Sequence, residues 1–192
     1  MEVEIIRKAL ESDRMALALI NARAFSNDWS LLDNDSNKVA QALFNGINID
    51  VYYVACIDDK IVGFLSYVTE NQRALAIDSK SFQKVKGFFK GYAIAMMLKN
   101  EFEEPLHLKK SQVYIDILGI DPDYAHRGIG TKLIQYLIDN SNFEEFSLKV
   151  TNINMNAIQC YRKNGFEEYK REKVKYPKQM GFEEYIYMAR AK

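Results

Sequence analysis

Two glycines separated by a single residue, Gly128 and Gly130, give the strongest chemical signal in this sequence. They lie in the segment Arg127-Gly-Ile-Gly-Thr131, between an apolar, β-branched run and a stretch with helical periodicity. Glycine permits the tightly turned, sterically bare backbone that a strand-to-helix turn needs. The first amides of a helix have no partner inside the helix and carry the positive end of its dipole. The segment therefore predicts a site for an anion such as a phosphate or pyrophosphate.

The spacing excludes two common nucleotide-binding loops. A P-loop is longer and has Lys-Ser or Lys-Thr directly after its last glycine, and neither pair follows Gly130 here. A dinucleotide fingerprint has three glycines, of which only Gly128 and Gly130 are present. A glycine-rich helix start without any ligand is the alternative interpretation, and the turn alone does not decide between the two.

A second motif follows about one supersecondary unit later. Residues 154–166 read Asn-Met-Asn-Ala-Ile-Gln-Cys-Tyr-Arg-Lys-Asn-Gly-Phe, a helical pattern with an Asn-Gly stop. Together with Ile-Asp-Pro-Asp-Tyr-Ala-His-Arg-Gly-Ile-Gly-Thr-Lys-Leu-Ile at residues 120–134, this segment resembles the GNAT superfamily of acyl-CoA-dependent N-acyltransferases. Two motifs in the right order are more specific than either one alone. The match to the family's motifs is clear over residues 113–166. The order of the predicted strands and helices also resembles the family over most of residues 1–69 and 111–189.

The resemblance implies an N-acetyltransferase that moves an acetyl group from acetyl-CoA to a primary amine, with both substrates bound together. Amides of residues 127–131 would contact the pyrophosphate, and an amide of Leu118 or Gly119 would contact the acyl carbonyl. The coenzyme-binding residues that the resemblance implies are Leu118, Gly119, Ile120, His126, Arg127, Gly128, Ile129, Gly130, Thr131, Asn154 and Tyr161. A non-catalytic CoA-binding sensor or scaffold is the alternative function.

One position departs from the family pattern. The first residue of the turn is usually Gln or Arg, and here it is Ala125. Because backbone amides make most of the phosphate contacts, CoA binding is expected to survive this change. Arg127 and His126 can compensate electrostatically, although either side chain could instead be solvated surface. Asn154 also has a second interpretation as the N-terminal cap of its helix, and both roles can hold at once.

Two side chains are candidates for proton transfer. Tyr161 matches the tyrosine that protonates the leaving CoA thiolate in many family members, whereas a helical tyrosine is otherwise usually core. Asp116 lies where several members have an acidic residue and could accept the proton of the amine. It could instead pair with a lysine or arginine, and strand alternation places it on one face with Tyr114 and Leu118. Cys160 has no paired histidine, so no acetyl-enzyme is expected.

The surrounding elements predict one mixed α/β (α+β) domain over residues 1–192. The resemblance implies a mostly antiparallel sheet of about seven strands, splayed between strands 4 and 5, with helices on both faces. The patterns predict strands at residues 3–7, 51–57, 61–68, 113–120, 143–150, 166–176 and 182–189. They predict helices at residues 12–25, 36–44, 81–102 and 154–164, and from the Gly128 turn to residue 140.

Residues 70–110 are expected to be a helical insertion, because the family usually has a short link between strands 3 and 4. Residues 81–102 predict a helix of at least five turns, interrupted by Gly87 and Gly91. Its apolar stripe is Phe82, Val85, Phe88, Phe89, Tyr92, Ala95, Met96 and Phe102. The insertion could be a lid or acceptor-pocket wall, or alternatively a covering helix or dimer contact. Further candidates for the wall of the acceptor pocket are Phe25, Trp29, Leu31 and Leu32. The alternative for these four residues is a position in the hydrophobic core without a role in binding.

Composition limits the remaining functions. Lysine plus arginine and aspartate plus glutamate number 26 each, so no overall field favours nucleic acid or an anionic membrane. Cys56 and Cys160 lack metal-type spacing and predict packed thiols in a reducing compartment, with no metal site. The N-terminus has no signal-peptide pattern, and no apolar run approaches membrane-spanning length, so a soluble cytoplasmic protein is expected.

No motif identifies the acceptor amine, on a small molecule or a protein, and a homodimer would suit the aromatic insertion.

Overall fold

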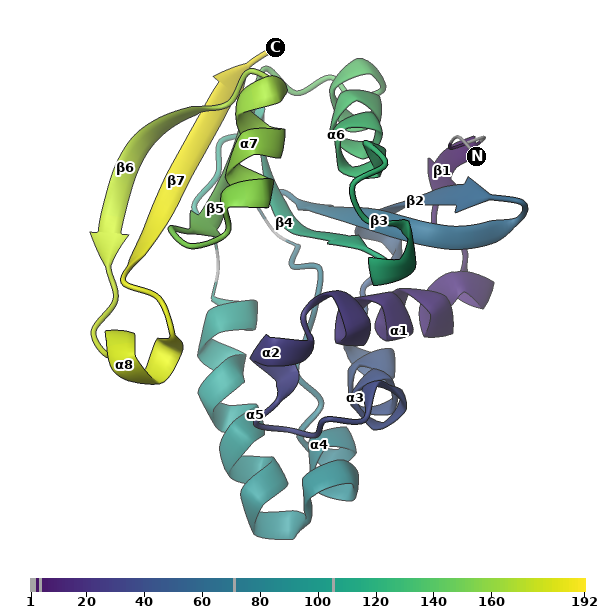
Figure 1. Cartoon of the computed structure of the whole chain (residues 1–192), viewed down its shortest axis with the longest axis vertical. Helices are drawn as coiled ribbons and strands as arrows, with labels where there is room; N and C mark the ends of the chain where they lie inside the picture. The colour runs from purple at the N-terminus through teal and green to yellow at the C-terminus, as the bar shows by residue number, and fades with distance from the viewer. Residues whose placement is uncertain (1–2, 4, 71, 105) are drawn as a thin grey trace.

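The computed structural model describes residue 3 and residues 5–70, 72–104 and 106–192. The described strands form one mixed sheet in the order β1-β2-β3-β4-β5-β7-β6 (Figure 1). Every neighbouring pair is antiparallel except β4 and β5. The mixed, mostly antiparallel sheet expected from the sequence is therefore confirmed. The strands are β1 (Ile5–Lys8), β2 (Tyr52–Ile57), β3 (Lys60–Val68), β4 (Gln112–Ile120), β5 (Glu145–Thr151), β6 (Glu167–Lys173) and β7 (Glu184–Ala191).

Helices cover both faces of the sheet, as expected. α6 and α7 pack over one hydrophobic cluster, and α1, α3, α4 and α5 pack over the other (Figure 1). Trp29, which lies between the predicted helices at residues 12–25 and 36–44, is part of the short helix α2. The helices are α1 (Arg14–Ala24), α2 (Ser26–Trp29), α3 (Ser36–Leu43), α4 (Ser79–Lys86), α5 (Phe88–Glu103), α6 (Ile129–Asp139), α7 (Met155–Lys163) and α8 (Pro177–Met180). None of the described helices is long and apolar enough to cross a membrane.

Strands β4 and β5 separate partway along their length. Their parallel register begins at Gln112 and ends where Ile115 faces Leu148. β4 continues to Ile120, still paired with β3 on its other edge. The edge of β4 over residues 116–120 therefore has no strand partner among the described residues. The expected splay between the fourth and fifth strands is confirmed.

A bulge in β4 alters which side chains share a face. Ser66 of β3 faces Ile117 and the next residue of β3 faces Ile115, so Asp116 is the extra residue. The Ile117 amide donates to the Ser66 hydroxyl at 2.9 Å at this point. Tyr114 then packs on the cluster beneath α1, whereas Leu118 packs on the cluster beneath α6. The prediction that both share a face with Asp116 is wrong, because one extra residue reverses strand alternation.

The insertion between β3 and β4 is helical, but it is a hairpin of two helices. Gly87, with φ of 87°, ends α4, and α5 returns beside it (Figure 1). A Cβ at Gly91 would lie 2.4 Å from the backbone oxygen of Phe82, so the close helix crossing requires glycine there. The prediction of one continuous apolar stripe along residues 81–102 is wrong, because the chain reverses at Gly87 and the side chains of the two helices do not follow one common periodicity. Phe82 and Ala95 are buried, whereas the exposed members are Phe88, Phe89, Tyr92 and Met96.

Candidate active site

The turn before α6 has the geometry of an anion site. Gly128 is the N-cap in the left-handed conformation, with φ of 75°, and no side chain caps the helix. The first helical bond runs from the Lys132 amide to the Gly128 carbonyl at 3.1 Å. Among the described residues nothing accepts a hydrogen bond from the amides of Ile129, Gly130 or Thr131. A Cβ at Gly128 would meet no atom within 4 Å, so the turn itself is open at Gly128, next to these unpaired amides.

Side chains from α1 and the preceding turn hold this loop in place. Arg23 of α1 donates to Asp121 and to Asp123, both at 2.9 Å. The Arg127 guanidinium lies 5.0 Å from the centre of the Tyr124 ring and donates to the Asp123 carbonyl at 3.3 Å. Arg127 therefore packs against the loop as well as carrying charge beside it. Sequence analysis missed Arg23, because nothing local links it to residues about 100 positions later.

The open edge of β4 presents selected backbone amides. The amides of Ile117 and Asp121 both donate toward β3. Successive peptide groups of a strand point to opposite edges, so the amides of Leu118 and Ile120 point into the gap. The Gly119 amide points toward β3. Of the two amides considered for the acyl carbonyl, that of Leu118 has the suitable direction.

Tyr161 lies on α7, with its side chain largely buried and its ring centre 6.0 Å from that of Phe166. Burial, with a smaller contribution from the Cys160 thiol, raises the pKa of Tyr161 above its ordinary value. Its hydroxyl therefore stays protonated at neutral pH and is available as a proton donor. Burial, followed by Asp116, likewise raises the pKa of Tyr114 on β4.

The contacts between α6 and α7 account for several other predicted residues. Asn154 caps α7, since its side chain accepts from the Ala157 amide at 3.1 Å. The predicted cap role is confirmed, and its contact with CoA stays a prediction. Thr131 lies 3.6 Å from the Cys160 sulfur and accepts from Asn164 at 3.4 Å. The Thr131 side chain thus joins the two helices. Only the backbone amide of Thr131 is then available to an anion at the Gly128 turn.

Asp116 makes the ion pair that was the alternative to a catalytic role. Arg73 donates to one carboxylate oxygen at 3.3 Å, and the Ala74 amide donates to the other at 3.3 Å. Burial raises the pKa of Asp116, although Arg73 acts in the opposite direction. A carboxylate with a raised pKa beside the gap can still act as a base. Asp116 as the base stays a prediction, and sequence analysis had not identified Arg73.

Strands β6 and β7 carry further polar groups on the far side of β5 from β4. Tyr187 donates to Glu172 at 3.0 Å, and burial followed by that carboxylate raises the pKa of Tyr187 to about 12. The Lys149 ammonium lies 4.2 Å from the centre of the Tyr185 ring. Burial raises the pKa of Asp116, and Lys149 on β5 is the smallest of the contributions that lower it.

The four candidate wall residues have different environments. Trp29 is buried, donates to Asn21 at 2.8 Å and stacks on Phe102 at 5.8 Å between ring centres. Leu32 is also core, whereas Leu31 is 61 % exposed. Phe25 reaches β4, since a Cβ at Gly119 would lie 3.5 Å from its ring. Phe25 therefore remains the wall candidate closest to the open strand.

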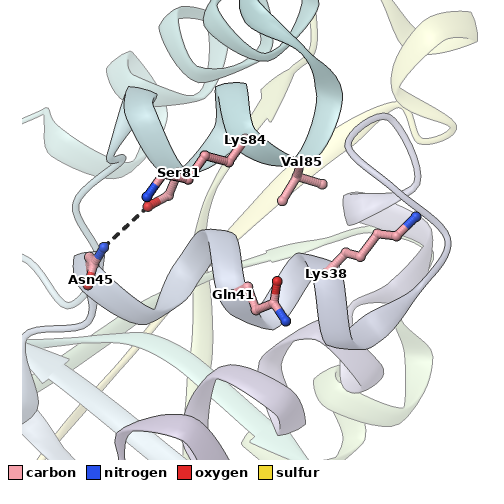
Figure 2. A pocket seen from close by; sticks show the side chains of 6 residues that line it. All are labelled: Lys38, Gln41, Asn45, Ser81, Lys84 and Val85. Carbon is pink, nitrogen blue, oxygen red and sulfur yellow. Dashed lines mark hydrogen bonds between the residues drawn. The ribbon is translucent and has the colours of Figure 1, made fainter.

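Two cavities lie away from this gap. One, of about 420 Å³, lies between α3 and α4 and is lined by Lys38, Gln41, Asn45, Ser81, Lys84 and Val85 (Figure 2). The other, of about 570 Å³, lies beside β5 and β7 and includes Ser111, Glu145 and Arg190. Neither contains a predicted site residue, so the candidate site is the open gap of the sheet. The described residues contain no group of three or more His, Cys, Asp or Glu side chains that could hold a metal ion.

Comparisons with solved structures show the same fold. The ribosomal-protein-alanine N-acetyltransferase from Brucella melitensis is 20 % identical, with a TM-score of 0.61 and coverage of 98 % of this chain and 100 % of that chain. Arabidopsis thaliana Naa50, in complex with the bisubstrate analogue CoA-Ac-MVNAL, is 20 % identical, with a TM-score of 0.59 and full coverage of both chains. The ribosomal-protein-S18-alanine N-acetyltransferase from Escherichia coli is 18 % identical, with a TM-score of 0.58 and coverage of 97 % and 92 %.

No curated protein sequence matches this chain significantly. The family model described as "Acetyltransferase (GNAT) family" matches residues 16–166. This range includes nearly all of α1, the open edge of β4, the Gly128 turn and the whole of α7. Since it spans well over half of the sequence, the chain belongs to the GNAT acetyltransferase family and is an acyltransferase.

Proposed function

We propose that this protein transfers the acetyl group of acetyl-CoA to a primary amine by direct attack in a ternary complex. The main observation in favour is the gap beside β4. It has inward-pointing amides of Leu118 and Ile120 on one side, and α7, which carries the protonated Tyr161, contacts α6 through Cys160 and Thr131. Backbone donors and a protonated phenol are the groups that expulsion of a thiolate requires.

Two sets of backbone amides fit the two ends of CoA. Those of Ile129, Gly130 and Thr131 would bind the pyrophosphate at the positive end of α6. The Leu118 and Ile120 peptide groups would pair with the amides of the pantetheine arm, as an added strand would. Both sets are main-chain donors, so Ala125 in place of the usual Gln or Arg does not remove them.

Proton transfer would use one acid and one base. The amine loses a proton to Asp116, directly or through water, and its lone pair forms a bond to the acetyl carbon. The Leu118 amide stabilises the negative charge that develops on the carbonyl oxygen. As the carbon–sulfur bond breaks, Tyr161 donates its proton to the sulfur. The nitrogen then loses its second proton to water, Asp116 releases the proton that it accepted, and Tyr161 recovers a proton from solvent, so the reaction of an ammonium ion releases one proton in all.

The acceptor would approach from the side of β6 and β7. Asp116 is paired with Arg73 and Glu172 with Lys170, so neither carboxylate adds a net negative charge on that side. Two of the similar structures are enzymes named for acetylating an alanine of a ribosomal protein, and a third contains a peptide-like bisubstrate analogue. A protein amino terminus is therefore included with small amines among the proposed acceptors.

An amine panel with acetyl-CoA tests this function. The panel contains polyamines, amino acid amides, aminoglycosides and peptides with a free amino terminus, and the released thiol is measured. The same peptides with a blocked amino terminus are the control and should give no thiol above the background rate. Calorimetric binding of acetyl-CoA without turnover of any amine would support the non-catalytic alternative. Absence of binding heat would contradict both functions.

A further inference from the structure

Helix α5 has apolar side chains on both of its sides. On one side Ala95 is fully buried, and Ile94, Leu98 and Phe102 pack against the same core. On the other side the exposed fractions are 69 % for Phe88, 83 % for Phe89, 50 % for Tyr92, 43 % for Met96 and 56 % for Met97. A helix that is apolar all round is normally buried, and an exposed apolar patch marks an interaction surface. The exposure is greatest at the start of α5.

The same segment is strongly basic, although the whole chain is neutral. Residues 79–100 contain five of the 26 basic residues and none of the 26 acidic ones, the five being Lys80, Lys84, Lys86, Lys90 and Lys99. The total charge of zero therefore conceals a local excess of five positive charges. A clustered excess of this kind attracts a negatively charged surface.

Few of these charges are neutralised within the protein. Lys99 pairs with Glu103 at 3.6 Å. Asp33 pairs with Lys38 at 3.5 Å, and its pKa is lowered mainly by the Asp35 amide, with Lys86 as the smallest contribution. In the described part of the chain, the exposed Lys80, Lys84 and Lys90 have no ion-pair partner. Lys84 extends over the cavity between α3 and α4 toward Ser81 (Figure 2).

The two properties meet at the corner of the helical hairpin, Lys86-Gly-Phe-Phe-Lys90. Figure 1 shows this corner at the end of the molecule away from the sheet. The rings of Phe88 and Phe89 are 5.2 Å apart and nearly perpendicular, and both lie outside the core. Gly87 sets the reversal that places the two rings at the tip. The corner therefore presents two aromatic rings between two lysines.

We propose that this corner docks the protein on the surface of an anionic phospholipid bilayer. Phe88 and Phe89 would enter the boundary between headgroups and acyl chains, and Lys86 and Lys90 would contact the headgroup phosphates. Charge complementarity favours this occupant over a second copy, since tip-to-tip pairing of two copies would bring like charges together. The surface lies apart from the β4 gap, so the inference does not depend on the proposed acetyl transfer.

Vesicle sedimentation tests the proposal with the full-length chain. Vesicles of phosphatidylcholine with about one third phosphatidylserine should bind the protein, and vesicles of phosphatidylcholine alone should bind it at least tenfold more weakly. The double variants Phe88→Ser/Phe89→Ser and Lys86→Gln/Lys90→Gln should each lower the affinity by about tenfold or more. Matched controls are Leu10→Ser and Lys109→Gln/Lys110→Gln, which change exposed residues elsewhere and should bind as the wild type does.

Fluorescence gives an independent measurement. The one tryptophan, Trp29, is buried, so a Phe89→Trp variant adds a single exposed reporter. Lipids brominated on the acyl chains should quench this added emission and leave the wild-type emission unchanged. Absence of binding to the anionic vesicles, or binding that the corner variants do not weaken, would overturn the proposal. A dimer in sedimentation analysis that Phe88→Ser/Phe89→Ser dissociates, without vesicle binding, would assign the patch to a second copy instead.

Discussion

Arg23 of α1 donates a hydrogen bond of 2.9 Å to Asp121, a residue 98 positions later in the chain. The same carboxylate accepts from the Asp123 amide at 3.0 Å and so caps the short turn that precedes Gly128. The Asp121 side chain is only 4 % exposed. A helix from the first part of the chain therefore fixes the position of the proposed pyrophosphate-binding turn.

Replacing Arg23 by Gln should weaken CoA binding about tenfold and lower the free energy of unfolding by about 1–2 kcal/mol, because Asp121 loses its charged partner in a largely buried position. Calorimetry with CoA and thermal denaturation measure the two effects. Arg171→Gln, which breaks an exposed pair on β6, is the control and should leave CoA binding unchanged. Wild-type CoA affinity in Arg23→Gln would show that the turn does not need α1.

Tyr161→Phe should lower kcat by about a hundredfold or more while CoA affinity stays within about twofold, because only the proton donor is removed. Steady-state kinetics and CoA calorimetry separate the two quantities. Tyr136→Phe is the matched control, since Tyr136 lies on α6 and packs on Tyr53 at 5.2 Å between ring centres. Equal kcat in Tyr161→Phe and the wild type would assign the acid to another group.

Asp116→Asn should remove the rise in kcat/KM with pH that ionisation of Asp116, with its raised pKa, should give the wild type. Only the ionised carboxylate accepts a proton, so wild-type activity is low below that pKa and increases above it. The pH–rate profiles of the two proteins provide the measurement, with the exposed Asp139→Asn as the control. An unchanged profile would limit Asp116 to its ion pair with Arg73.

Cys160→Ser should remain active, because direct transfer needs no thiol nucleophile. Intact-protein mass spectrometry after incubation with acetyl-CoA alone should show no acetylated species in either protein. The loss of the contact with Thr131 should cost about 1 kcal/mol or less. A stable acetylated wild-type protein that Cys160→Ser abolishes would instead indicate a covalent intermediate.

Asp13→Asn should reduce the free energy of unfolding at pH 7 by about 1 kcal/mol, because Arg7 donates to Asp13 at 2.6 and 3.1 Å and is partly screened by solvent. The Arg7 hydrogen bonds hold the pKa of Asp13 below its ordinary value of 3.8. The folded state then binds fewer protons than the unfolded state between these two pKa values. The stabilisation is complete above about pH 4 and is lost as the pH falls through the folded-state pKa.

Urea denaturation of both proteins at several pH values measures this effect. The difference in unfolding free energy between wild type and Asp13→Asn should disappear at acid pH. A difference that stays constant down to pH 2 would show that the loss comes from packing rather than from charge.

The sequence alone was enough for features that depend on neighbouring residues. The Gly128 turn, the Asn154 cap and the glycine break at residue 87 all follow from local backbone preferences. The strands and most helices could be located because apolar periodicity reports which side of each element is buried. The spacing of the two motifs was sufficient to identify the family, since both lie within a short part of the chain.

Tertiary structure decided which distant residues meet. Arg23 reaches the turn, Arg73 pairs with Asp116, and the bulge at Asp116 turns Leu118 toward α6. The exposed tip at Phe88 and Phe89 likewise depends on how α5 packs after Gly87. The physical reason is range: a local pattern sets backbone conformation, whereas ion pairs, strand register and burial depend on segments that come together only when the chain folds.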